Sequence, residues 1–105
     1  MKKDDYFVIA YRILAVLYEK LKAGESVDLK EISHETMGIN ERYWAWIMRA
    51  MRDSGRMTGV EDVAGGVVVD EPEITETGIL FLMENSGIEK AKRFLKELKA
   101  AVPGL

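Results

Sequence analysis

Four arginines between positions 40 and 56 are the side chains of this sequence best suited to binding chemistry. Arginine presents a planar fork of donors that can bind a phosphate or the edge of a guanine through two hydrogen bonds. The four are Arg42, Arg49, Arg52 and Arg56. The same stretch holds only two acids, Glu41 and Asp53. We therefore predict a candidate nucleic-acid surface here, with a solvated helix face and ordinary ion pairs as the open alternative.

Trp46 lies in the same stretch and suggests a different use. If Tyr43, Ile47 and Met51 point inward at helical spacing, Trp46 sits about a third of a turn or more away from them. An exposed tryptophan often anchors a protein interface. Burial against the last helix or the N-terminal arm is the alternative. Trp46 is thus a candidate interface residue, for a homodimer or for another protein.

A helix from Asn40 to about Ser54 must position these residues. Asn40 is a good N-cap and Gly55 a good terminator. A preceding helix is expected from Leu29 to Thr36 or Met37, begun by Asp28 and Glu31 as in a capping box. The short turn Met37-Gly38-Ile39 then makes a helix-turn-helix. Its outward side should carry Asn40, Glu41, Arg42, Ala45, Trp46 and Arg49, a side that can enter a major groove.

A β-hairpin is expected next. Two β-prone runs, Met57 to Val63 and Val67 to Asp70, flank Ala64-Gly65-Gly66, and Glu71-Pro72 should break or edge the second run. Residues 57–78 hold six acids and no basic residue. Such a wing would be repelled by phosphates, so we do not expect the hairpin to contact DNA.

Helices should flank this unit on both sides. The first is expected from Asp4 or Asp5 to Lys22, followed by a short strand at Val27. Its broad apolar face comprises Phe7, Ile9, Ala10, Ile13, Leu14, Leu17, Tyr18 and Leu21. A fourth helix, capped by Thr75 or Thr77, should reach Met83 or Asn85.

A last helix is expected from about Ile88 to Ala101, and it is basic. Its charged residues are Lys90, Lys92, Arg93, Lys96 and Lys99 against Glu89 and Glu97. Its packing face comprises Ile88, Ala91, Phe94, Leu95 and Leu98. The basic side can meet phosphates, an acidic partner, membrane lipid or the acidic hairpin of a second copy. A packed helix with a lysine-rich solvent side is the alternative.

Together these elements predict one α+β domain over residues 1–105, a mostly helical winged helix-turn-helix with a small hairpin wing and two C-terminal helices. Leu14 and Ile47 should lie in the core. The methionines expected to fill gaps there are Met37, Met48, Met51, Met57 and Met83.

Several classes of function find no support in the sequence. His34 stands between Glu31 and Glu35 with no serine, cysteine or second histidine to complete a catalytic group, so no enzyme activity is predicted. No metal, cofactor or small-molecule substrate is predicted either, because the chain lacks cysteine and has one histidine. The apolar runs are interrupted by charges, so we expect no membrane span and a cytoplasmic protein.

The tail ITETGILFLMENSGIEKAKRFLKELK resembles the YjcQ family of small, phage-associated bacterial proteins. The runs Tyr11-Arg12-Ile13-Leu14 and Met51 to Val60 agree with that likeness, which covers nearly the whole chain. The resemblance implies a winged-helix-like fold and a prophage origin, with no functional residue to carry over.

Two functions remain as hypotheses. One is a weak or accessory DNA-binding or regulatory protein that uses the four arginines. The other is a protein-interaction module, binding a second copy or a phage or host protein through Trp46.

Overall fold

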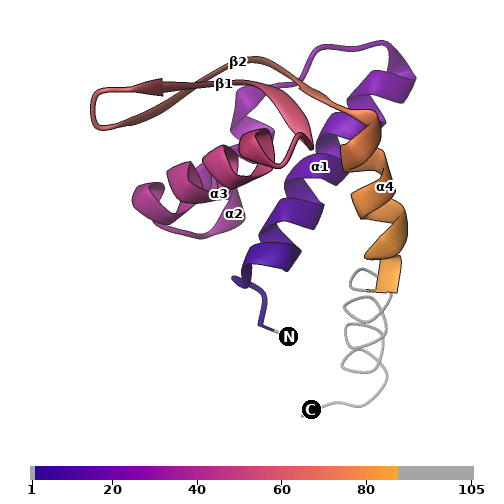
Figure 1. The fold of residues 1–105 in the computed structure, drawn as a ribbon, viewed down its shortest axis with the longest axis horizontal. Coiled ribbons are helices and arrows are strands. Elements are labelled where there is room, and N and C mark those ends of the chain that lie inside the picture. Colours follow the sequence, from indigo (N-terminus) through magenta and orange to yellow (C-terminus); the bar gives the residue numbers. More distant parts are fainter. Residues whose placement is uncertain (1, 88–105) are drawn as a thin grey trace.

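A computed structural model describes residues 2–87 (Figure 1). The chain forms α1 (Tyr6–Ala23), the short 3₁₀ helix η1 (Leu29–Ile32), α2 (His34–Met37), α3 (Glu41–Asp53), the strands β1 (Met57–Val63) and β2 (Gly66–Ile74), and α4 (Glu76–Glu84). The described part is therefore α+β, with four α-helices and one antiparallel hairpin. This arrangement is compatible with a winged helix. No helix in residues 2–87 is long and apolar enough to cross a membrane.

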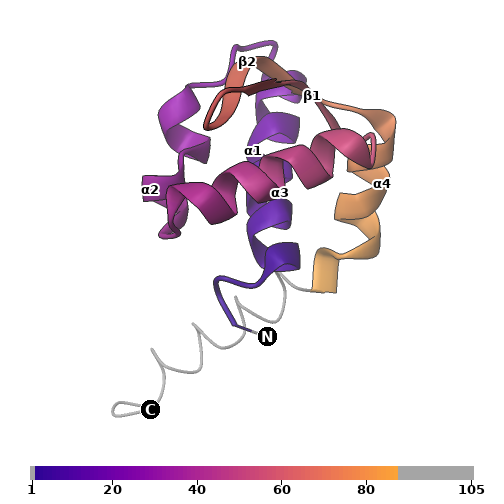
Figure 2. The same cartoon turned by 60° about the vertical axis from the view of Figure 1, so that its left-hand side comes forward.

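Helix α1 lies at the centre, between α3 and α4, with the hairpin across one end (Figures 1 and 2). Its side chains Ile9, Ile13 and Leu14 have no exposed surface. The predicted apolar face was too wide, because Phe7 is 49% and Leu21 is 51% exposed. Both lie near the ends of α1, where fewer elements cover it.

The segment after α1 differs from the expectation in two ways. Asp28 caps as predicted, accepting a hydrogen bond from the Lys30 backbone N–H at 3.0 Å. However, the expected single helix is split at Ser33, whose extended backbone ends η1 while its hydroxyl caps α2. Serine favours such an N-cap position over a helix interior. The strand expected at Val27 is also wrong, because the only described sheet contains β1 and β2.

Helix α3 begins as the sequence predicts. The Asn40 side chain accepts a hydrogen bond from the Tyr43 backbone N–H at 2.8 Å. Ile47, Met48 and Met51 are fully buried. Ala45 was expected to face outward and is only 6% exposed, because its side of α3 meets the hairpin.

The hairpin is longer than predicted and contains a bulge. Its turn is Ala64-Gly65, with Val63 opposite Gly66. The second strand continues through Pro72 to Ile74, so Glu71-Pro72 does not break it and instead lies on an edge strand, the other predicted alternative. Between the paired positions Thr58↔Glu73 and Val60↔Val69, the strands leave regular register. Gly59, at φ +88°, allows the second strand to bend there, since a Cβ would lie 2.5 Å from the Asp70 carbonyl oxygen.

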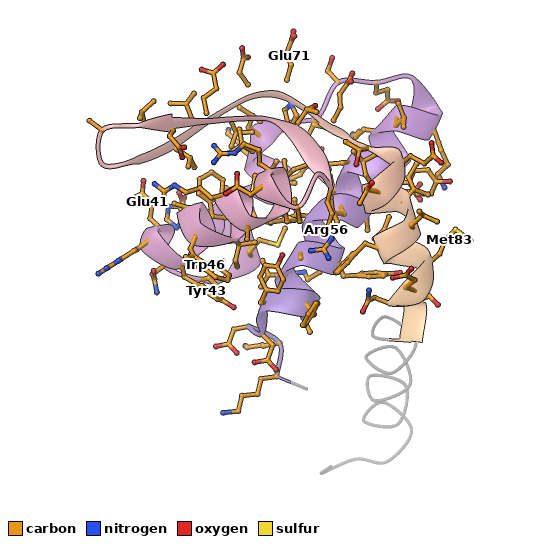
Figure 3. All side chains as sticks on the ribbon, in the orientation of Figure 1. Glu41, Tyr43, Trp46, Arg56, Glu71 and Met83 are labelled. Carbon is orange, nitrogen blue, oxygen red and sulfur yellow. The ribbon has the colours of Figure 1, made fainter. Side chains whose placement is uncertain are left out.

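Helix α4 is begun by Thr75, whose hydroxyl accepts a hydrogen bond from the Gly78 N–H at 3.1 Å. Phe81 and Leu82 are buried against the core. Met83 was predicted in the core but is 68% exposed, because it follows Leu82 around the helix and points away (Figure 3). The predicted last helix, Ile88 to Ala101, lies outside the described residues.

Candidate functional site

Two of the four candidate arginines bind the hairpin. Arg49 and Arg52 lie one turn apart on α3 and share Asp62 of β1, at 3.0 and 3.2 Å. Arg49 also donates to the Gly66 carbonyl at 3.0 Å, and Arg52 to the Val60 carbonyl at 3.3 Å. The paired guanidinium groups lower the pKa of Asp62, with Arg52 the larger cause. We call Arg49, Arg52 and Asp62 the hairpin clamp.

Arg56 also makes contacts within the fold. Its guanidinium donates to the Tyr6 hydroxyl at 3.2 Å and lies 4.6 Å from the centre of the Phe81 ring. These contacts connect the end of α3 to α1 and α4. A partly buried guanidinium over an aromatic face is stabilised there by a cation–π interaction.

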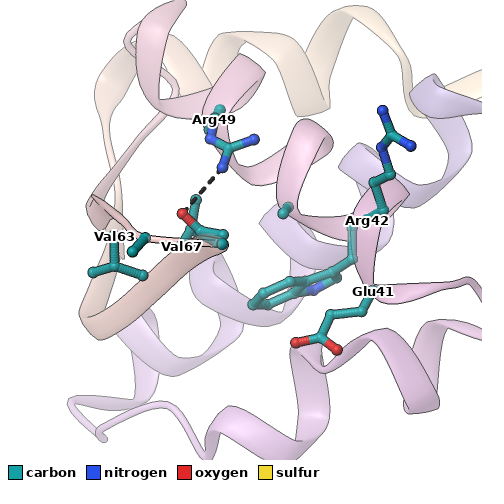
Figure 4. Close-up of a pocket in the computed structure, with 10 residues that line it drawn as sticks. Glu41, Arg42, Arg49, Val63 and Val67 are labelled. Carbon is teal, nitrogen blue, oxygen red and sulfur yellow. Dashed lines mark hydrogen bonds between the residues drawn. The ribbon is translucent and has the colours of Figure 1, made fainter.

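Arg42 differs from the other three. It is exposed and makes no hydrogen bond or ion pair with any residue in the described range 2–87. It borders a groove of about 660 Å³ between α3 and the hairpin, together with Glu41, Arg49 and Val63 (Figure 4). The guanidinium of Arg42 is thus available to a ligand in the way the sequence predicts, while its neighbour Arg49 is bonded to Gly66.

Trp46 is 56% exposed, so the described N-terminal segment does not bury it. The last helix, the other element predicted to cover it, lies outside the described residues. The Trp46 ring meets Tyr6 edge to face at 5.5 Å, on the side of α3 away from the hairpin (Figure 3). The ring centres of Tyr6 and Phe7 lie 5.1 Å apart, and Phe7 stacks on Phe81 with their ring centres 6.1 Å apart. We call the exposed rings of Trp46 and Phe7, with Tyr6 between them, the aromatic surface.

Trp44 has the opposite surroundings from Trp46. Its indole N–H donates to the Ile32 carbonyl at 2.8 Å, and its ring packs against the core. Next to it, the Tyr43 hydroxyl donates to the Asp4 carbonyl at 2.8 Å and ties the N-terminal segment to α3. Burial raises the pKa of Tyr43, and the nearby carboxylates add to the shift.

The remaining polar groups suggest no chemistry of their own. His34 lies 3.3 Å from the Ile39 carbonyl and 3.4 Å from Glu35, both contacts within its own helix-turn region. Within residues 2–87 no three potential ligands come together to hold a metal ion.

The sequence did not identify Asp62 as the partner of the arginines. The sequence did contain a signal for this pairing, because Arg49 and Arg52 share one side of a helix and Asp62 is an acid on the strand that follows. Finding the pairing required the direction in which the hairpin folds back over α3. Whether any of the four arginines contacts nucleic acid stays a prediction.

Comparison with known proteins gives one match. No curated protein and no solved structure matches the chain. The model of the family described as "YjcQ protein" matches residues 11–101. That match confirms the resemblance carried by the tail, and the chain belongs to the YjcQ family.

Proposed function

We propose that this protein is a cytoplasmic, non-enzymatic protein-interaction module with a winged-helix fold, and that the aromatic surface is its contact site. The observation that carries the proposal is the 56% exposure of Trp46 beside the half-exposed Phe7. Tryptophan is enriched among residues that dominate binding energy. Adjacent exposed rings mark a surface suited to another protein.

The clamp supports this choice over DNA recognition. Arg49 and Arg52 already share a carboxylate, so contact with a phosphate would compete with Asp62. The hairpin exposes further acids, among them Glu61, Asp70 and Glu73, that would repel a phosphate backbone. An aromatic surface can bind either kind of partner suggested by the sequence analysis, a second copy or a phage or host protein.

The test places a photo-crosslinking amino acid at position 46 of the full chain, with the same group at Val68 as control. Val68 is also exposed but lies on β2, away from the aromatic surface. We expect an adduct specific to position 46, with a second copy or with one other protein, and its loss in a Phe7→Ala background. Sedimentation of the parent chain and of Trp46→Ala identifies the self-association case. Equal adducts at both positions, or none at position 46, would overturn the proposal.

A second candidate function is accessory DNA binding, favoured by the open guanidinium of Arg42. In a winged helix this part of α3 can lie in a major groove. A single arginine that makes one phosphate contact predicts weak binding with a shallow salt dependence, because the slope grows with the number of phosphates neutralised.

Fluorescence anisotropy with mixed duplex DNA at low and moderate salt tests this candidate. Arg42→Ala should weaken binding, whereas Lys22→Ala removes one positive charge at the far end of α1 and should not. Arg49→Ala is a poorer probe, because it also removes one of the two arginines of the hairpin clamp. Absence of binding at low salt would exclude the DNA candidate.

A further inference from the structure

A second groove, of about 440 Å³, lies at the opposite end of α1 from the aromatic surface. Its apolar part includes Leu21 and Leu29, which are 51% and 45% exposed, together with the buried Pro72. Its rim on the hairpin side is formed by Asp70, Glu71 and Glu73. Figure 3 shows Glu71 pointing away from the body of the fold. We call this feature the acidic groove.

The charge of the acidic groove is not neutralised within residues 2–87. Its one cation, Lys20, is held by Glu25 and Glu31 at 3.4 and 3.3 Å. Those contacts raise the pKa of Lys20, with Glu31 the larger cause. The acids on the hairpin rim form no ion pair with a described residue. An apolar floor with an acidic rim suits a segment that is apolar on one side and basic on the other.

The chain itself contains such a segment. Residues 88–99 carry five basic residues against two acids, with apolar residues at helical spacing. We propose that residues 88–99 of a second copy bind the acidic groove, with Phe94, Leu95 and Leu98 toward Leu21 and Leu29 and the lysines toward the hairpin acids.

The position of α4 indicates that residues 88–99 reach the acidic groove from a second copy and not from the same chain. Phe81 stacks on Phe7, so α4 ends near the start of α1 (Figure 1). Leu21 lies fourteen residues further along α1, about 21 Å away at the helical rise. A helix over residues 88–99 would be about 18 Å long, so one that continues from Gly87 could not lay its middle across this groove.

The contact is head to tail, because one surface of the chain binds a different surface of the next. Such contacts form rings or open chains of copies, and salt weakens them when charges carry the recognition. The inference extends the proposed interaction role to a second surface and does not depend on Trp46.

The test uses charge reversal in the full chain, followed by sedimentation velocity over a concentration series at low salt. The groove variant is Glu71→Lys with Glu73→Lys, and the tail variant is Lys92→Glu with Lys96→Glu. Each should weaken self-association by roughly tenfold or more, because like charges then face each other. Mixing the two variants, or combining all four substitutions in one chain, should restore association. The control Glu61→Lys with Glu76→Lys reverses two exposed acids outside the groove and should behave nearly as the parent.

The outcomes separate this inference from the proposed function. A monomeric parent, or association that both reversals leave unchanged, would overturn the head-to-tail contact. Association abolished by Trp46→Ala but insensitive to the reversals would leave the aromatic surface standing alone. Association restored by mixing and unaffected by Trp46→Ala would support the acidic groove and assign no self-association to Trp46.

Discussion

The two flanks of α3 differ in the side chains that they carry and in what those side chains contact. Toward the hairpin, Arg49 and Arg52 are bound to Asp62 and to backbone carbonyls. Arg42 borders the groove on this same side but makes no ion pair with any described residue. On the side away from the hairpin, Trp46 is exposed. The presence of an arginine on a helix therefore does not predict a nucleic-acid surface until the residues that contact that arginine are known. Substitutions on the buried, clamped and open sides of α3, and at its junction with α4, should therefore differ in their effects.

Replacing Ile47 with alanine should have the largest effect. Ile47 has no exposed surface on the core side of α3, so the variant should lose about 2 to 5 kcal/mol of unfolding free energy. Urea denaturation measures the loss. Leu80→Ala, at a half-exposed position on α4, is the control and should change little. An unchanged midpoint for Ile47→Ala would mean that the assigned core side of α3 is wrong.

Gly78→Ala should destabilise the junction where α3, the hairpin and α4 meet. A Cβ at Gly78 would lie 2.6 Å from Cγ1 of Ile74 and would also press on the Arg56 carbonyl. We expect a cost of about 1 to 3 kcal/mol, although alanine normally favours a helix. Gly87→Ala is the matched control, because its Cβ would meet no atom of residues 2–87 within 4 Å. Equal thermal midpoints for the two variants would contradict this packing.

Substitutions of the two tryptophans should distinguish the packed side of α3 from its open side. Trp44→Phe removes the hydrogen bond to the Ile32 carbonyl and should cost about 0.5 to 1.5 kcal/mol. Trp46→Phe keeps an aromatic ring beside Tyr6 and should leave stability nearly unchanged. Chemical denaturation of both variants measures the difference. If Trp46→Phe were the more damaging substitution, the open side would be part of the folding core.

The hairpin clamp should make a small, pH-dependent contribution to the stability of the folded protein. The folded-state pKa of Asp62 lies below its ordinary value of 3.8, so its contribution is present above that pH and is lost as the pH falls through the lowered pKa. Between about pH 4 and about pH 2, the parent should therefore lose more stability than Asp62→Asn. Asp70→Asn, which removes an acid outside the clamp, should follow the parent. Identical pH profiles for Asp62→Asn and the parent would show that the clamp does not stabilise the hairpin.

The sequence alone determined the local features of this protein. Asn40 and Asp28 cap where their side chains predict, and Thr75 is one of the two caps predicted for α4, because a cap involves residues two or three positions apart. Paired glycines located the hairpin turn, and the tail sequence identified the family.

Only the tertiary structure decided which side of each element is covered. Helical spacing places Ala45, Trp46 and Arg49 near one another on α3, but Ala45 is buried beside the groove at the hairpin and Arg49 binds the hairpin, while Trp46 is open. Met83 is apolar and exposed for the same reason, since no described element packs over its side of α4. Periodicity fixes which residues share a face of a helix, whereas burial depends on contacts between segments that are distant in the chain.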